Sequence, residues 1–111
     1  MTTMQQQRDS LQLAEPVVVV GLGKTGLSVA RFLVDCGVEF TVVDSRDIPP
    51  GLQELKSLVS EKNIVAGEFK PELFNSAMTL VVSPGVSVQE PLIKAASERG
   101  ASIIGDIELF A

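Results

Sequence analysis

The sequence predicts an α/β fold, a Rossmann-like, doubly wound sheet of five parallel strands with helices on both faces. Residues 17–20 are four consecutive valines, which is typical of a strand buried on both faces of a parallel sheet. Strand-like and helix-like segments then alternate along the chain. The segment Gly21-Leu22-Gly23-Lys24-Thr25-Gly26 matches G-x-G-x-x-G and lies between the first strand and the first helix, the context that this nucleotide-binding motif requires.

The first half of the chain predicts two strand–helix units. After the valine strand and the glycine turn, apolar residues recur at helical spacing until Gly37 ends the helix: Leu27, Ala30, Leu33 and Val34. Residues 39–44 predict the second strand. Pro49-Pro50-Gly51 then interrupts the chain and starts a helix that runs to about Val59.

The second half continues the alternation with shorter segments. The predicted elements are a short strand at 63–66, a weak helix near 71–75, a strand at 78–82, a helix at 91–99 and a strand at 101–104. Ser83-Pro84-Gly85 ends the fourth strand, and Gly100 closes the last of these helices.

The 111 residues are expected to hold one folded domain, at residues 16–105. Residues 1–15 are polar and rich in glutamine, so we expect a disordered leader. Gly105-Asp106 is predicted to begin a further helix through residue 111. The apolar Leu109-Phe110 pair in that single turn suggests a domain cut from a longer protein, with residues 106–111 starting the connection to the missing part.

Composition excludes several classes of protein. A net charge of −5 argues against a general nucleic-acid binder. The chain has one cysteine, Cys36, and no histidine, which excludes an internal disulfide, a Cys/His zinc site and a histidine general base. We expect Cys36 to be a packing residue. Neither a signal peptide nor an 18-residue apolar run is present, so a cytoplasmic protein without membrane contact is expected.

The glycine turn is predicted to hold a phosphate group. Gly21 permits the tight turn, Gly23 lets a phosphate approach the backbone, and Gly26 lets the helix pack closely on the strand. The helix start presents N–H groups and partial positive charge to an anion, to which Thr25 could add a hydroxyl and Lys24 a charge. A P-loop is excluded because Val18 occupies the position of its first glycine. The alternative is a turn that the glycines only shape.

Two further segments are candidates for the same site. Asp44 ends the second strand, where a carboxylate commonly accepts hydrogen bonds from ribose hydroxyls; the alternative is a carboxylate that caps its own turn. Arg46 could pair with phosphate or stack on a base, or it could be a solvated surface charge. Ser83 and Gly85 follow the fourth strand, which lies beside the first strand in a doubly wound sheet. They could bring a hydroxyl and a bare backbone to the cleft; the alternative is that they form a plain turn.

These features leave several functions open at this point. One is the NAD(P) domain of an oxidoreductase, with Arg46 facing a 2′-phosphate. Another is the nucleotide-sugar-binding domain of a larger synthetic enzyme. A third is a regulatory sensor of nucleotides or coenzyme A.

Four segments together resemble one family. VVVVGLGKTGLSVARFL, VVDSRDIPPG, LVVSPGV and IIGDIELF occur in the order and approximate spacing of the N-terminal domain of the bacterial Mur ligases, in particular of the D-glutamate-adding members. The resemblance covers residues 16–111. Another amino-acid-adding Mur ligase is the nearest competing assignment within the family.

The resemblance implies a domain that holds the UDP part of UDP-N-acetylmuramoyl-L-alanine. The diphosphate would lie over Gly23, Lys24, Thr25 and Gly26, with Lys24 acting through its backbone because that position varies. Asp44 and Ser45 would meet the polar edge of uracil and Arg46 the base, and Gly85, after Ser83-Pro84, would approach from the other side.

The resemblance also implies that the chemistry lies elsewhere. In peptidoglycan synthesis, and so in bacterial cell-wall growth, shape and division, the full-length enzyme uses ATP and Mg²⁺ to activate the substrate carboxylate for D-glutamate. That step requires a P-loop in a central domain, and a C-terminal domain, and no G-x-x-x-x-G-K-[ST] occurs in this chain. We therefore expect a domain that binds UDP, contributes no catalytic residue and holds neither a cofactor nor a metal.

Overall fold

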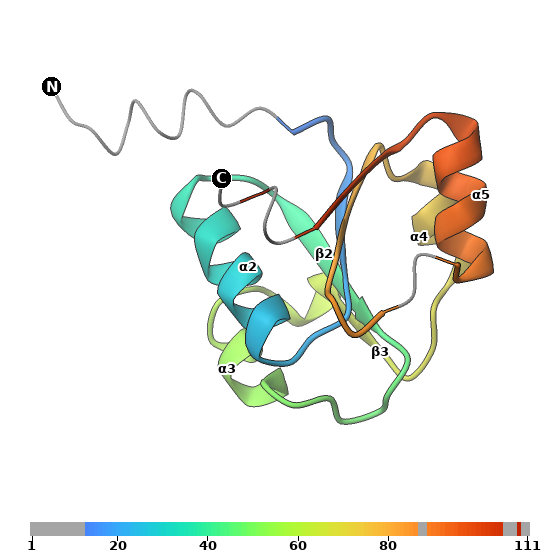
Figure 1. The fold of residues 1–111 in the computed structure, drawn as a ribbon. Coiled ribbons are helices and arrows are strands. Elements are labelled where there is room, and N and C mark those ends of the chain that lie inside the picture. Colours follow the sequence, from blue (N-terminus) through green and yellow to red (C-terminus); the bar gives the residue numbers. More distant parts are fainter. Residues whose placement is uncertain (1–12, 87–88, 106–108, 110–111) are drawn as a thin grey trace, which may run out of the picture.

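The computed structural model describes residues 13–86, 89–105 and 109. Strands and helices alternate along them, as the sequence predicts (Figure 1). The elements are β1 (Val17–Val20), α2 (Lys24–Asp35), β2 (Phe40–Asp44), α3 (Leu52–Lys56), the 3₁₀ helix η1 (Glu61–Asn63), β3 (Ile64–Ala66), α4 (Pro71–Ser76), β4 (Thr79–Val82), α5 (Pro91–Arg99) and β5 (Ser102–Gly105).

The five strands form one parallel sheet in the order β3-β2-β1-β4-β5. β1 is central, and its Val17 lies opposite Phe40 of β2 on one side and Thr79 of β4 on the other. The chain thus extends the sheet first in one direction from β1 and then in the other. The predicted fold class is confirmed, and the reversal places a crevice beside the carboxyl end of β1.

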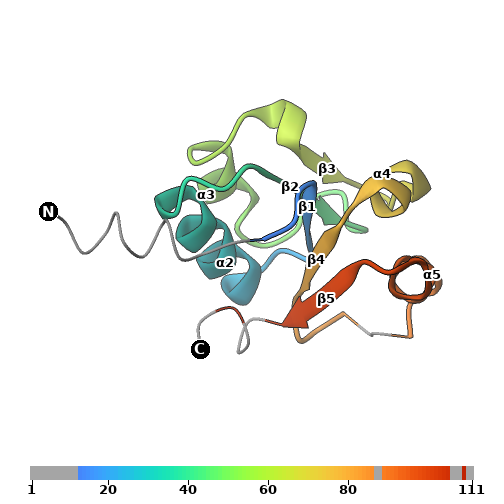
Figure 2. The same ribbon diagram turned by 90° about the horizontal axis from the view of Figure 1, so that it is seen from above.

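Helices cover both faces of the sheet. Figure 2 shows α2 and α3 on one side of the strands and α4 and α5 on the other. The valines of β1 alternate between the two resulting cores: Val17 and Val19 pack on the α2 side, and Val18 and Val20 pack on the α4–α5 side. All four are at most 2% exposed. This double burial explains the uninterrupted valine run, since neither face of β1 meets water.

The main difference from the predicted elements is the length of α3. The helix ends at Lys56 rather than near Val59, because the chain tightens after it. The N–H of Ser57 donates to the Glu54 carbonyl at 3.1 Å, and that of Leu58 donates to the Leu55 carbonyl at 2.9 Å. Such i→i+3 bonds end an α-helix. Leu58 and Val59 still pack on the α2-side core and are half-buried, so their apolar character reflects this packing and not a helix.

The ends of the predicted domain also differ from expectation. Leu13 packs against the core and the Thr79 hydroxyl donates to the Ala14 carbonyl at 2.8 Å, so the contacts of the domain begin before residue 16. Gly105 was expected to begin a helix but is the last residue of β5. Leu109 is buried in the α2-side core. The rest of the expected leader and terminal helix lies outside the described residues.

Cys36 follows α2 and is 8% exposed, in agreement with the predicted packing role. Within the part of the chain that the structure describes, no helix has the length and apolar character needed to cross a membrane.

Candidate functional site

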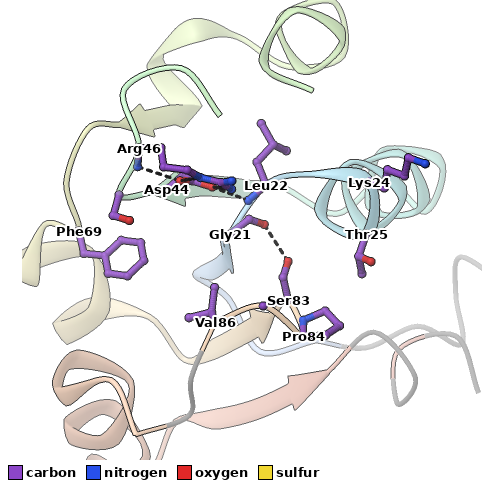
Figure 3. A pocket seen from close by; sticks show the side chains of 12 residues that line it. Gly21, Leu22, Lys24, Thr25, Asp44, Arg46, Phe69, Ser83, Pro84 and Val86 are labelled. Carbon is purple, nitrogen blue, oxygen red and sulfur yellow. Dashed lines mark hydrogen bonds and ion pairs between the residues drawn. The ribbon is translucent and has the colours of Figure 1, made fainter. Parts of the chain in front are cut away.

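A cleft of about 480 Å³ lies at the carboxyl ends of β1, β2 and β4 (Figure 3). Its walls come from the turn after β1, the start of α2 and the loops that follow β2, β3 and β4. The lining residues are Gly21, Leu22, Lys24, Thr25, Asp44, Ser45, Arg46, Phe69, Ser83, Pro84, Gly85 and Val86. The cleft therefore occupies the crevice where ligands bind in open parallel sheets.

The glycine turn has the geometry that its spacing predicts. Gly21 and Gly23 have φ of 93° and 111°, in the region that side chains disfavour. A Cβ on Gly23 would meet nothing within 4 Å, so its backbone faces open space. A Cβ on Gly26 would overlap the Gly21 carbonyl oxygen, so only glycine lets α2 pack this closely on the turn.

The start of α2 is open to an anion. Gly23 is the N-cap, and no side chain accepts a hydrogen bond from the N–H groups of the first turn. The first turn also carries no acidic residue. These N–H groups have no intrahelical partner, and the helix dipole adds partial positive charge. The arrangement suits a phosphate group.

Asp44 is buried at 4% exposure, and both of its oxygens are engaged. Oδ2 accepts hydrogen bonds from the N–H of Leu22 at 2.8 Å and from Nη2 of Arg46 at 2.7 Å. Oδ1 accepts from the N–H and from Nε of Arg46, both at 2.9 Å. Asp44 thus caps its own turn, the alternative noted from the sequence, and it also reaches the glycine turn.

The protonation equilibrium of Asp44 follows from these contacts. Burial raises the pKa of its carboxyl, but the hydrogen bonds from the Arg46 side chain and from the Leu22 and Arg46 N–H groups outweigh burial. The pKa is therefore held below its usual value. The side-chain hydrogen bond to Asp44 raises the pKa of Arg46, whose side chain is 53% exposed at the edge of the cleft.

The Ser83-Pro84-Gly85 turn meets the glycine turn from the opposite side. Ser83 is 8% exposed, and its hydroxyl donates to the Gly21 carbonyl at 2.8 Å. The N–H of Val86 closes the turn by donating to the Ser83 carbonyl at 3.0 Å. Gly85 is exposed, and a Cβ there would meet nothing within 4 Å. The hydroxyl therefore faces protein backbone, and Gly85 borders open space.

The family model for the Mur ligase MurD-like N-terminal domain matches residues 15–105. The chain belongs to this family. Proteins named UDP-N-acetylmuramoylalanine–D-glutamate ligase are similar to the chain. The one from Marinobacter nauticus is 52% identical over 85% of this chain and 21% of the relative. The one from Nitrosococcus oceani is 50% identical over 90% of this chain and 22% of the relative.

A solved structure is also similar to this MurD-like domain. It is a pseudomurein peptide ligase type C from Methanothermus fervidus, with a TM-score of 0.67 and 25% identity over 85% of this chain and 19% of that one. The chain thus spans about a fifth of the length of the relatives that it matches.

Most of the site residues predicted from the sequence lie together in the MurD-like domain. Those that line the cleft are Lys24, Thr25, Asp44, Ser45, Arg46, Ser83 and Gly85. Gly23 and Gly26 belong to the turn beside the cleft without lining it. Among the described residues, no group of acidic or cysteine side chains could hold a metal ion.

The sequence prediction missed Phe69, a half-buried aromatic residue after β3 that lines the cleft. Figure 3 shows its ring on the same side of the cleft as Arg46 and facing Val86. The centroid of this ring lies 5.5 Å from that of the buried Phe74, and the two rings are tilted against each other. The missed signal was positional: loops that follow neighbouring parallel strands meet at one edge of the sheet, so the loop after β3 belongs to the site.

Proposed function

We propose that this chain is the UDP-binding domain of a ligase that adds D-glutamate to UDP-N-acetylmuramoyl-L-alanine in bacterial peptidoglycan synthesis. One observation carries the proposal. In a chain of the MurD-like family, the glycine turn at the start of α2 and the Asp44–Arg46 pair line a single cleft. A phosphate site and a base site side by side are what a nucleoside diphosphate requires.

The diphosphate lies over the start of α2 in this proposal. The open first turn of the helix supplies N–H donors, and Thr25, which lines the cleft, adds a hydroxyl that can donate to a phosphate. Lys24 is exposed at the rim, where its charge is solvated and adds little beyond its backbone N–H. Gly85 leaves space on the opposite wall for the diphosphate to pass.

The uracil lies near Ser45, Arg46 and Phe69. The Ser45 hydroxyl can bond the polar edge of the base, and a guanidinium plane or an aromatic ring can stack on its face. Arg46 is held in place by the side-on pair with Asp44, so little conformational entropy remains to be lost on binding.

The contacts of Asp44 favour UDP over a dinucleotide. In dinucleotide-binding domains, the acidic residue after the second strand accepts hydrogen bonds from ribose hydroxyls. A carboxylate has about four acceptor positions, and Asp44 already receives four hydrogen bonds from Leu22 and Arg46. A ribose would have to displace one of these bonds.

The chain binds the substrate and does not catalyse. In the proposed reaction of the full-length protein, the L-alanine carboxylate is phosphorylated by ATP with Mg²⁺, and the amine of D-glutamate then displaces the phosphate. The present chain has no P-loop, so those steps belong to the central and C-terminal domains of the longer protein, in the cytoplasm.

An amide NMR titration with UDP, UDP-N-acetylmuramate derivatives, NAD and NADP tests the proposal. With the UDP compounds we expect shifts at residues 23–26 and 44–46 and at Gly85, with a dissociation constant in roughly the high-micromolar to millimolar range because only one domain contacts the ligand. Stronger binding of NAD or NADP at the same amides would contradict a UDP site. Shifts confined to residues outside the cleft would contradict any nucleotide function there.

A further inference from the structure

Two side chains hold a single peptide unit of the glycine turn. The Gly21 carbonyl and the Leu22 N–H belong to the same peptide bond. The carbonyl accepts a hydrogen bond from the Ser83 hydroxyl, and the N–H donates to Oδ2 of Asp44, each at 2.8 Å. Figure 3 shows the two bonds approaching the turn from opposite sides, one from the end of β4 and one from the end of β2.

The surroundings fix this peptide unit in one orientation. Asp44 and Ser83 are 4% and 8% exposed, so water competes little for either bond. If the peptide unit rotated by half a turn, the Gly21 carbonyl oxygen would face the Asp44 carboxylate and both bonds would be lost. Gly21 has φ of 93°, and glycine's freedom would otherwise permit several orientations here. The two side chains remove that freedom.

While they hold the turn, Asp44 has no acceptor position to spare and Ser83 has no proton to donate to a phosphate. The four hydrogen bonds to Asp44 use its acceptor positions, and the single hydroxyl proton of Ser83 is donated to Gly21. The first N–H groups on the ligand side of the turn come after the Gly21–Leu22 peptide unit, at the start of α2. Their direction depends on how this unit is oriented.

We propose that Asp44 and Ser83 are positioning residues, which clamp the Gly21–Leu22 peptide unit and so aim the N–H groups at the start of α2 toward an anion. The sequence prediction had placed both among the ligand contacts. The inference rests on the proposed function in one respect, that the anion is the diphosphate of UDP. Asp44 also binds Arg46, so the same carboxylate joins the phosphate side of the cleft to the base side.

Ser83→Ala is the informative variant, because it removes one bond of the clamp without adding volume. Two quantities are measured in the 111-residue chain: amide hydrogen exchange of Leu22 without ligand, and binding of UDP and of inorganic pyrophosphate. We expect Leu22 exchange to accelerate about 10-fold and both ligands to bind about 5- to 10-fold more weakly, as for one lost hydrogen bond. Ser83→Thr keeps the hydroxyl, so its Leu22 exchange and its ligand binding should remain close to those of the unaltered chain.

Two controls separate the clamp from general damage. Ser76→Ala makes the same chemical change on the exposed side of α4 and should leave Leu22 exchange and binding unchanged. The amide of Val19 in β1 reports global opening, so its exchange measures how far Ser83→Ala lowers the stability of the whole domain, and the change at Leu22 is compared with it. If Ser83→Ala fails to fold, Ser83→Cys gives the same test, since a thiol is only a weak hydrogen-bond donor to the Gly21 carbonyl. Leu22 exchange should again accelerate, and both ligands should again bind more weakly.

The outcomes distinguish the inference from the proposed function. Weaker ligand binding with unchanged Leu22 exchange in Ser83→Ala would make Ser83 a direct ligand contact and overturn the clamp. Faster Leu22 exchange with unchanged binding of both anions would overturn the positioning role. If the unaltered chain binds neither UDP nor pyrophosphate, the proposed function fails, whereas the Leu22 exchange still shows whether the clamp exists.

Discussion

The Asp44 carboxylate contacts both halves of the cleft, the glycine turn through Leu22 and the base side through Arg46. The two members of the ion pair differ in exposure: Asp44 is buried, whereas the Arg46 side chain is 53% exposed. A change at Arg46 should therefore affect the ligand more than the fold, and a change at Asp44 should affect both.

Arg46→Ala should weaken UDP binding about 10-fold, because the cation that faces the base is lost. The free energy of unfolding should change little, since the ion pair is partly exposed and Asp44 keeps its two backbone N–H donors. Calorimetry and urea unfolding measure the two quantities. Arg31→Ala, an exposed arginine on α2, is the matched control and should change neither.

Arg46→Lys separates charge from geometry. A lysine cannot bond both oxygens of Asp44 side-on as Nε and Nη2 of Arg46 do, so we expect affinity to remain close to that of Arg46→Ala. Full recovery with lysine would show that a positive charge alone suffices, and unchanged affinity in Arg46→Ala would remove Arg46 from the site.

The lowered pKa of Asp44 predicts a pH-dependent contribution to stability. In the folded protein the pKa of this carboxyl lies below its ordinary value of 3.8. As pH falls, the unfolded chain therefore takes up the proton before the folded protein does. The stabilisation is complete well above pH 3.8 and is lost as pH falls from there through the folded pKa. The excess unfolding free energy of the unaltered chain over Asp44→Asn should therefore shrink between about pH 5 and pH 2.

Urea unfolding at a series of pH values measures that difference. Glu98→Gln makes the same chemical change at an exposed carboxyl on α5 and is measured alongside as the matched variant. A difference between the unaltered chain and Asp44→Asn that stays constant down to pH 2 would contradict the role assigned to the Asp44 hydrogen bonds.

At the scale of elements, the contact between α2 and the turn after β1 decides how closely the helix approaches the sheet. The Gly26 Cα lies against the Gly21 carbonyl, which also accepts the Ser83 hydrogen bond. The start of α2, and with it the anion site, is therefore positioned by packing against backbone rather than by a helix-capping side chain.

Gly26→Ala should destabilise the domain by about 1–3 kcal/mol, although alanine favours a helix, because its Cβ would overlap the Gly21 carbonyl oxygen. Chemical unfolding checks this. The control is Gly85→Ala, where a Cβ meets nothing within 4 Å, and its unfolding free energy should remain within about 0.5 kcal/mol of the unaltered chain. A stable Gly26→Ala would show that the helix can move away from the turn at little cost.

At the scale of the whole molecule, the strand order brings together loops that are far apart in sequence. The β2 and β4 ends lie on either side of β1 because the sheet extends from β1 in both directions. Ser83 thereby contacts Gly21 across a separation of 62 residues, and Leu22 contacts Asp44 across 22. The clamp is a property of this topology and not of any contiguous motif.

Much of the fold and of the site could be predicted from the sequence. The valine run, the glycine spacing and the alternation of segments predict the parallel sheet, because each of these patterns lies in consecutive residues. Asp44, Ser45, Arg46, Ser83 and Gly85 were found because each ends or follows a predicted strand. The length of α3 was not predicted correctly, because Leu58 and Val59 are partly buried without being helical.

The sequence by itself determined the fold class, the family and the edge of the sheet at which a ligand would bind. Only the tertiary structure decided what each polar group does there. Asp44 and Ser83 have side chains able to bind a ligand, and nothing local shows that their hydrogen bonds are instead directed at Leu22 and Gly21. Phe69 likewise joins the cleft only through the packing of the loop after β3. The physical reason is that hydrogen-bond partners are chosen by distance in space, which the chain specifies only after it has folded.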